Sequence, residues 1–82
     1  MTTKRKHDAE EWLGERFRRL VNEDLGGPTA VASAIGVREQ SVINWYSRPK
    51  GPTAQKLKRL GKLLKAKLGW DWQRMMDELV SD

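Results

Sequence analysis

The sequence predicts an all-α fold, a small bundle of four to five helices, and three observations support this prediction. Apolar residues recur at helical spacing in several segments, and no segment carries a strand signal. Charged residues make up 33% of the chain, and runs of β-branched residues are few. The length of 82 residues leaves room for one core only. We therefore expect a flexible basic arm over residues 1–7 and a single domain over residues 8–82.

The first helix is expected over about residues 9–24. Asp8 suits the N-cap, and Glu11, three residues later, would complete a capping box. The helix should end at Gly26 and Gly27, because glycine commonly terminates helices. One apolar stripe runs along this segment at helical spacing and consists of Trp12, Leu13, Phe17, Leu20 and Val21.

Two shorter helices are expected over about residues 28–35 and 39–47. Pro28 suits the first turn of a helix, where its missing N–H group is not needed. Pro49 and Gly51 end the second of these helices and form a loop.

Two further helices complete the expected bundle. Pro52 opens a fourth helix that Gly61 interrupts, and Asp71 can cap a last helix. The buried side of the fourth helix consists of Leu57, Leu60, Leu63, Leu64 and Leu68. The last helix has an apolar face of Trp72, Met75, Met76, Leu79 and Val80. We expect this face to form the interface of a homodimer, with a surface for a protein partner as the alternative.

The stretch PTAVASAIGVREQSVINWYS, residues 28–47, fits two short helices that cross at a tight turn. Ala32 is small enough for a close crossing, and Gly36 supplies the positive φ that the turn requires. Val42 and Trp45 are three residues apart, so both can face one core. Such a helix-turn-helix presents its second helix outward, whereas the alternative is a plain helical hairpin within a bundle.

These residues resemble the helix-turn-helix of lambda-type phage repressors and Cro proteins. The resemblance covers about residues 28–65, with GGPTAVASAIGV, REQSVINWYSR and PKGPTAQKLKRLGKLL as the similar segments. It implies a lambda repressor-like fold, and a homodimer that binds double-stranded operator DNA and controls transcription. The arm TTKRK is similar to the basic arm that some members fold around DNA. Arg38 departs from the family, which often has Ser or Thr there as the cap of the recognition helix.

The helical angles predict which residues of the third helix would read DNA. With Val42 and Trp45 toward the core, Gln40 and Asn44 lie on the opposite face, where each could pair with adenine N6 and N7. Ile43 could contact a thymine methyl group, or lie at the rim of the core. The base-reading candidates are Arg38, Gln40, Ser41, Ile43, Asn44 and Ser47. Glu39 could accept a hydrogen bond from cytosine N4, but we favour a role at the positive end of its own helix.

Charge also favours a polyanionic partner. Residues 36–68 contain nine basic residues and one acidic residue, so the positive charge lies in and after the helix pair. The helix start at Thr29 can hold a phosphate through backbone N–H groups and a hydroxyl. The phosphate candidates are Thr29, Arg48, Lys50, Lys4, Arg5 and Lys6.

Several classes of function are not expected. The chain has no cysteine and one histidine, His7, so we expect no disulfide, metal site or cofactor. Paired carboxylates in a cleft, a nucleophile with a histidine base, and a phosphate loop are all missing, so we do not expect an enzyme. Without a signal peptide or a long apolar run, we expect a protein in the cytoplasm of a bacterial host, associated with the nucleoid when bound to DNA.

Two alternatives remain. Residues 52–70 are similar to a cationic amphipathic helix that lies on an anionic membrane; we expect no membrane contact, because a domain this small needs these leucines in its core. The second alternative is an antitoxin with the same fold, which would bind a toxin partner and regulate its own operon.

Overall fold

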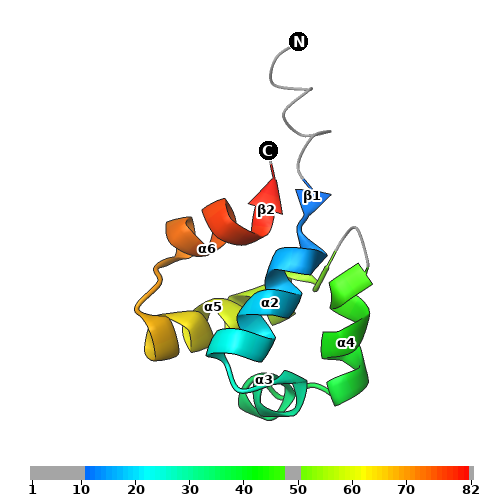
Figure 1. Cartoon of the computed structure of the whole chain (residues 1–82). Helices are drawn as coiled ribbons and strands as arrows, with labels where there is room; N and C mark the ends of the chain where they lie inside the picture. The colour runs from blue at the N-terminus through cyan, green and yellow to red at the C-terminus, as the bar shows by residue number, and fades with distance from the viewer. Residues whose placement is uncertain (1–10, 48–50, 82) are drawn as a thin grey trace.

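The computed structural model describes residues 11–47 and 51–81. Five helices in this part of the chain pack into one bundle, which confirms the expected all-α fold (Figure 1). In chain order the elements are β1 (Glu11–Trp12), α2 (Gly14–Asp24), α3 (Pro28–Ile35), α4 (Glu39–Ser47), α5 (Ala54–Leu68), α6 (Trp72–Leu79) and β2 (Val80–Ser81).

The first helix begins at Gly14, later than the sequence pattern predicts. Residues 11–12 form the short strand β1, which pairs antiparallel with β2, Glu11 opposite Ser81. The N–H of Leu13 continues this contact by donating to the carbonyl oxygen of Leu79 at 2.8 Å. Glu11 therefore lies in a strand and not in a capping box, and its expected partner Asp8 lies outside the described residues.

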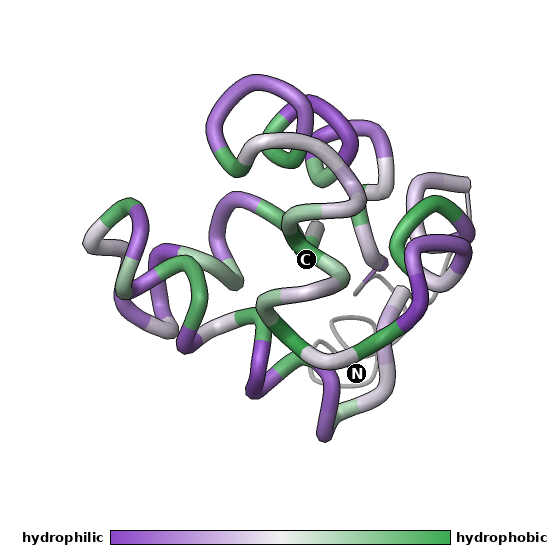
Figure 2. The backbone as a smooth tube through the Cα atoms, turned by 90° about the horizontal axis from the view of Figure 1, so that it is seen from below, coloured by the Kyte–Doolittle hydropathy of each residue, from purple (hydrophilic) through white to green (hydrophobic). Residues whose placement is uncertain are grey.

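The core is built around Phe17 of α2. Its ring centroid lies 5.2 Å from that of Trp12, 6.0 Å from that of Trp45 and 5.8 Å from that of Tyr46. The fully buried side chains come from all five helices and are Phe17, Val21, Val31, Val42, Leu60, Leu64, Met75 and Leu79. Hydrophilic and hydrophobic residues alternate along several helices, as expected when only one face of a helix is buried (Figure 2).

Close backbone contact between α2 and α4 depends on Gly14. A Cβ atom at this position would clash with the carbonyl oxygen of Tyr46. Any larger residue would therefore push the start of α2 away from the end of α4. The sequence pattern did not single out this glycine.

The helices after the first follow the expected bounds closely. Both α3 and α4 have the predicted limits. Asp71 caps α6 as predicted, since its carboxylate accepts from the N–H of Arg74 at 2.8 Å. The cap of α5 is Thr53, one residue after Pro52, and its hydroxyl accepts from the N–H of Lys56. This helix runs without interruption through Gly61.

Two of the expected dimer-interface residues lie inside the bundle. Met75 and Leu79 are each 1% exposed, because α6 uses this face to pack on α2 and α5 of the same chain. They cannot contact a second copy while the chain is folded, so this part of the prediction is wrong. Met76 and Val80 are partly buried, and Trp72 is 49% exposed.

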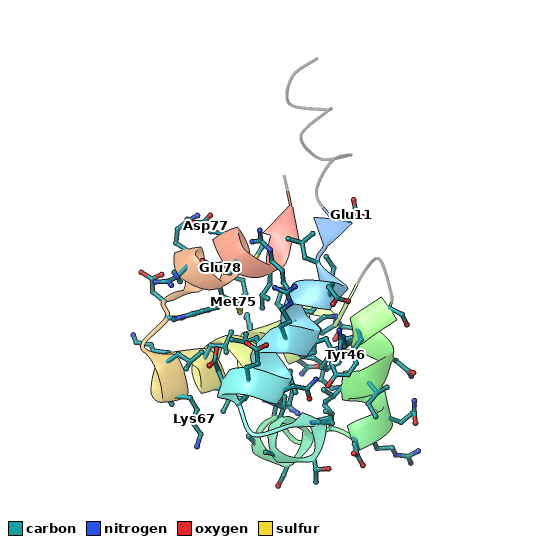
Figure 3. All side chains as sticks on the ribbon, in the orientation of Figure 1. Glu11, Tyr46, Lys67, Met75, Asp77 and Glu78 are labelled. Atoms are coloured by element: carbon teal, nitrogen blue, oxygen red, sulfur yellow. The ribbon has the colours of Figure 1, made fainter. Side chains whose placement is uncertain are left out.

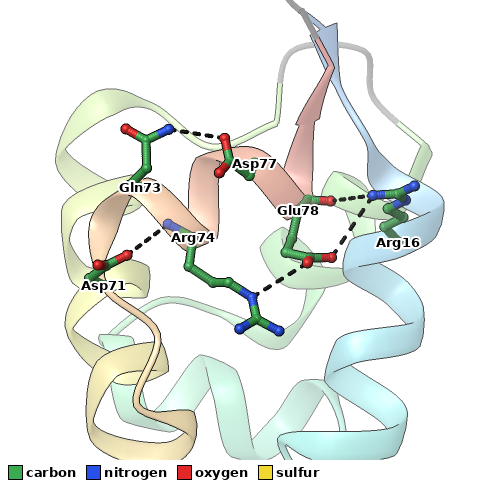
Figure 4. Close-up of polar contacts among 6 residues, drawn as sticks. All are labelled: Arg16, Asp71, Gln73, Arg74, Asp77 and Glu78. Carbon is green, nitrogen blue, oxygen red and sulfur yellow. Dashed lines mark hydrogen bonds and ion pairs between the residues drawn. The ribbon is translucent and has the colours of Figure 1, made fainter.

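Polar contacts fix the outer side of α6 (Figure 4). The guanidinium of Arg16 in α2 donates to the carbonyl oxygen of Glu78 at 3.3 Å. The carboxylate of Glu78 lies 3.4 Å from Nε of Arg74 and 3.9 Å from Nη1 of Arg16. These groups are exposed, so each ion pair adds less than about 1 kcal/mol.

The leucines of α5 lie where the expected single core requires them. Leu60 and Leu64 are fully buried, and Leu57, Leu63 and Leu68 pack against the core. This placement leaves α5 without the apolar face that an amphipathic membrane helix needs. Within the described residues, no helix has the length and apolar character needed to cross a bilayer.

Candidate nucleic-acid interface

The crossing of α3 and α4 has the predicted geometry. Gly36 ends α3 in the left-handed conformation, with φ 73° and ψ 39°. The N–H groups of Gly36 and Val37 both donate to the carbonyl oxygen of Ala32, the second at 3.0 Å. Ala32 is buried in the crossing. The local sequence therefore fixes the angle at which α4 leaves α3.

The inner face of α4 is anchored in the core. Val42 is 0% and Trp45 7% exposed. The indole N–H of Trp12 donates to the carbonyl oxygen of Trp45 at 2.8 Å. This carbonyl lies in the last turn of α4, where no intrahelical partner is available. Trp12 thus holds the C-terminal end of the helix.

The outer face of α4 carries the predicted polar residues. Gln40 and Ser47 are exposed, Asn44 and Ser41 are partly buried, and Ile43 is 37% exposed, which places it outside the core. The side-chain N–H₂ of Gln40 donates to the side-chain oxygen of Asn44 at 3.1 Å.

This hydrogen bond leaves Gln40 able to read a base. An amide nitrogen carries two hydrogens, and the contact with Asn44 uses one of them. Gln40 keeps its other N–H and its carbonyl oxygen, which match adenine N7 and N6 in the major groove. Asn44 fixes the rotamer of Gln40 and keeps its own N–H₂ for a further acceptor.

Arg38 lies at the start of α4 and is exposed. Its carbonyl oxygen accepts the first helical hydrogen bond, from the N–H of Ser41 at 3.0 Å. The helix therefore begins at the predicted residue, with Arg38 rather than a Ser or Thr before it. Its guanidinium is free to reach toward a base or a phosphate at this end of α4.

An acidic residue occupies the site where a phosphate was expected. The hydroxyl of Thr29 donates to the carboxylate of Glu39 at 3.0 Å, which ties the start of α3 to the start of α4. Glu39 lies in the first turn of α4, where the helix dipole favours a negative charge. A phosphate contact at Thr29 would therefore use backbone N–H groups, or would require the hydroxyl to leave Glu39. The sequence pattern does not predict this pair.

Arg59 of α5 has a structural role that the sequence pattern does not predict. Its guanidinium donates to the carbonyl oxygen of Ile35 at 3.2 Å, beside Gly36. A cation at the C-terminal end of α3 is favourable because of the helix dipole. Arg59 therefore braces the turn that orients α4, and only part of the basic charge of α5 is left for a ligand.

The side chain of Tyr46 in α4 is partly buried and packs against the core on the side of α2 (Figure 3). Its hydroxyl is buried and has no hydrogen-bond partner among the described residues. Burial raises the pKa of Tyr46, and the nearby charge of Arg18 lowers it by less. The ring therefore acts as packing behind α4 and not as a titrating group near neutral pH.

The remaining phosphate candidates, Arg48, Lys50, Lys4, Arg5 and Lys6, lie outside the described residues. Within residues 11–47 and 51–81, no group of three His, Asp or Glu side chains could hold a metal ion.

Comparisons with protein-family models, with curated proteins and with solved structures gave no match to this chain. The resemblance to phage repressors and Cro proteins therefore rests only on the sequence pattern of about residues 28–65.

Proposed function

We propose that this protein is a sequence-specific regulator of transcription that inserts α4 into the major groove of double-stranded DNA. The observation that supports this function best is the outer face of α4. It offers the amides of Gln40 and Asn44 to a ligand, while Val42 and Trp45 fix the helix to the core. A major groove accepts one α-helix of this width and displays the donors and acceptors that such amides recognise.

The contacts of α4 divide into two kinds. Gln40 would pair with an adenine, Ile43 would cover a thymine methyl group, and Arg38 would pair with a guanine at the helix start. The basic residues that surround the helix pair would supply the attraction to phosphates that does not depend on sequence. Specificity then comes from the outer face of α4, and most of the salt dependence comes from the lysines and arginines.

The regulator would bind its operator as a homodimer, as phage and prophage repressors of the resembled family do. Two copies of α4 would then meet two half-sites about 10 bp apart, or a multiple of that distance. Of the expected interface, Met76 in α6 and Val80 in β2 stay partly exposed, in addition to the exposed Trp72. Binding to operator DNA would place the protein in the cytoplasm of a bacterial host.

Selection of binding sites from random duplexes, at about 150 mM salt, tests this function. We expect a sequence preference with two related half-sites. The Gln40→Ala variant should lose the preference at one base of each half-site. Gln73→Ala is the matched control, because Gln73 is also exposed and also bonds a residue four positions later, Asp77, but on α6. Equal binding of wild-type protein to all duplexes would refute the proposal.

A further inference from the structure

A hollow of about 320 Å³ lies between α5 and the segment that leads into α6. Two tryptophans, Trp70 and Trp72, form its apolar part, and three lysines of α5, Lys58, Lys62 and Lys65, surround it. The acidic residue at its rim, Asp71, is already engaged as the N-cap of α6. The hollow is thus apolar inside and positively charged outside.

The apolar part of the hollow is held in place by the fold. The ring of Trp72 lies so close to α5 that a Cβ atom at Gly61 would be 3.1 Å from Cε3 of the indole. This contact explains a glycine in the middle of a long, regular helix. Yet 49% of Trp72 remains exposed, more than for any other large apolar side chain of the described residues. An indole fixed in place and left open to solvent is typical of binding surfaces.

The lysines share one face of α5. Lys58, Lys62 and Lys65 are spaced by four and three residues, which places them in a row along the helix. All are exposed, and none forms an ion pair with another described residue. The guanidinium of Arg74 lies 4.9 Å above the ring of Trp70, but it also pairs with the carboxylate of Glu78, so the lysines supply most of the charge. A ligand of this surface must therefore be anionic.

We propose that this hollow is the docking site for an acidic segment of a partner protein. One large apolar side chain of that segment would cover Trp72, and carboxylates on either side would pair with Lys58, Lys62 and Lys65. This mode, in which apolar anchors and flanking charges act together, is common for amphipathic helices bound in grooves. The proposal does not depend on DNA binding by α4.

Charge argues against a second copy of the chain as the occupant. In a two-fold symmetric dimer the same patch of both copies meets itself. A dimer centred on Trp72 would bring the lysine rows of the two copies together, which is unfavourable. A self-contact of α6 would therefore lie toward Met76 and Val80 instead.

Duplex DNA and lipid fit the hollow less well than an acidic protein segment. A duplex keeps its base faces stacked and has no large apolar group to cover an indole. Lipid binding needs an extended apolar face, but the leucines of α5 lie in or against the core. Figure 1 also shows α6 and α4 on opposite sides of the bundle. A partner on α5 and α6 could thus be bound while α4 contacts a ligand of its own.

The test uses NMR spectra of the ¹⁵N-labelled full chain during titration with a short helical peptide in which glutamates flank one phenylalanine. We expect the indole N–H signal of Trp72 and the amide signals of the lysine row to shift. Lys62→Glu should weaken binding about three- to fivefold. Lys67→Glu is the matched control, since Lys67 lies on the same helix but points away from α6 (Figure 3), and should change binding less than about twofold.

The contribution of Trp72 is tested from both sides of the interface. Trp72→Ala should weaken binding about tenfold, and replacing the phenylalanine of the peptide by alanine should cost the same. The two changes together should cost little more than either one, because they remove a shared contact. Should Trp72→Ala fail to fold, the comparison of Lys62→Glu with Lys67→Glu still tests whether the peptide binds at this hollow.

In the experiments with the peptide, four results would overturn the proposal: no shifts at Trp72, equal losses for both lysine variants, equal binding of the peptide without phenylalanine, or a change in dimerisation caused by Lys62→Glu. Titration with single-stranded oligothymidylate and with vesicles of anionic lipid completes the experiment. If either of these bound at Trp72 more tightly than the peptide does, the ligand of the hollow would be a nucleic acid or a membrane and not an acidic protein segment.

Discussion

Replacement of Trp12 by phenylalanine should weaken the anchoring of α4 in the core without altering the side chains on its outer face. The indole N–H of Trp12 donates to the carbonyl oxygen of Trp45 at 2.8 Å in a buried contact. Phenylalanine keeps a ring near Phe17, but it leaves this carbonyl without a donor. An unsatisfied buried acceptor costs about 1–3 kcal/mol. The missing ring atoms leave a cavity beside Gly51, and this adds about 1 kcal/mol.

We therefore expect Trp12→Phe to lower the free energy of unfolding by about 2–4 kcal/mol, a large part of the stability of a domain this size. The melting temperature should fall by about 10 °C or more. Urea denaturation followed by circular dichroism measures the change. The midpoint should move while the m-value stays constant, because the unfolded surface is the same.

The control is the same chemical change at an exposed position. Trp72→Phe removes an indole that is 49% exposed and has no hydrogen bond among the described residues, so it should cost less than about 1 kcal/mol. A loss below about 0.5 kcal/mol for Trp12→Phe would mean that the end of α4 does not depend on this contact. Our explanation of how α4 is held would then be wrong.

The remaining predictions concern DNA binding and assembly. Gln40→Ala should weaken binding to the selected duplex by about 1–3 kcal/mol and leave binding to random duplexes nearly unchanged, as competition titrations can measure. Under the proposed function, Glu39→Gln should strengthen binding to all duplexes about two- to fivefold, because it removes a negative charge from the surface that would meet the phosphates. A gain limited to one base pair would show that Glu39 reads a base instead. Met75→Ala should destabilise the single chain by about 2–5 kcal/mol in urea titrations. Met76→Asp should instead weaken dimerisation in sedimentation experiments, and an unchanged dimer would place the interface elsewhere.

Elements with strong local signals could be predicted from the sequence. Pro28 at the start of α3, Gly36 at its end and Asp71 before α6 act on the residues next to them, so their effect does not depend on the rest of the fold. The inner face of α4 followed from the spacing of Val42 and Trp45. These are the parts in which local preference and tertiary structure agree.

Contacts between distant residues were not visible in the pattern. The segment around Trp12 has helical periodicity, yet Glu11 pairs with Ser81, and this pairing overrides the local preference for a helix. The close approach of Gly14 to the backbone of α4 depends on where α4 ends in space. The position of Gly14 in the sequence therefore could not predict this contact. Helical periodicity also could not tell whether Met75 faces its own core or a second copy.

The candidate site shows the same division. The residues of the outer face of α4 could be predicted, because helical geometry alone decides which side chains oppose Val42. The hydrogen bond between Thr29 and Glu39 joins the starts of α3 and α4. It could be predicted only if the angle between the two helices were known. The role of Arg59 could likewise be predicted only if the position of α5 relative to the end of α3 were known.

These unpredicted contacts act together on α4. Thr29 holds the start of α4, Arg59 braces the turn before it, and Trp12 holds its end. A recognition helix that is fixed before it meets DNA loses little conformational freedom on binding. Most of the energy of its base contacts would then appear as affinity. If α4 is preorganised in this way, Trp12→Phe should weaken binding to the selected duplex even at temperatures where the variant is fully folded, because the end of the helix must then be ordered by the DNA.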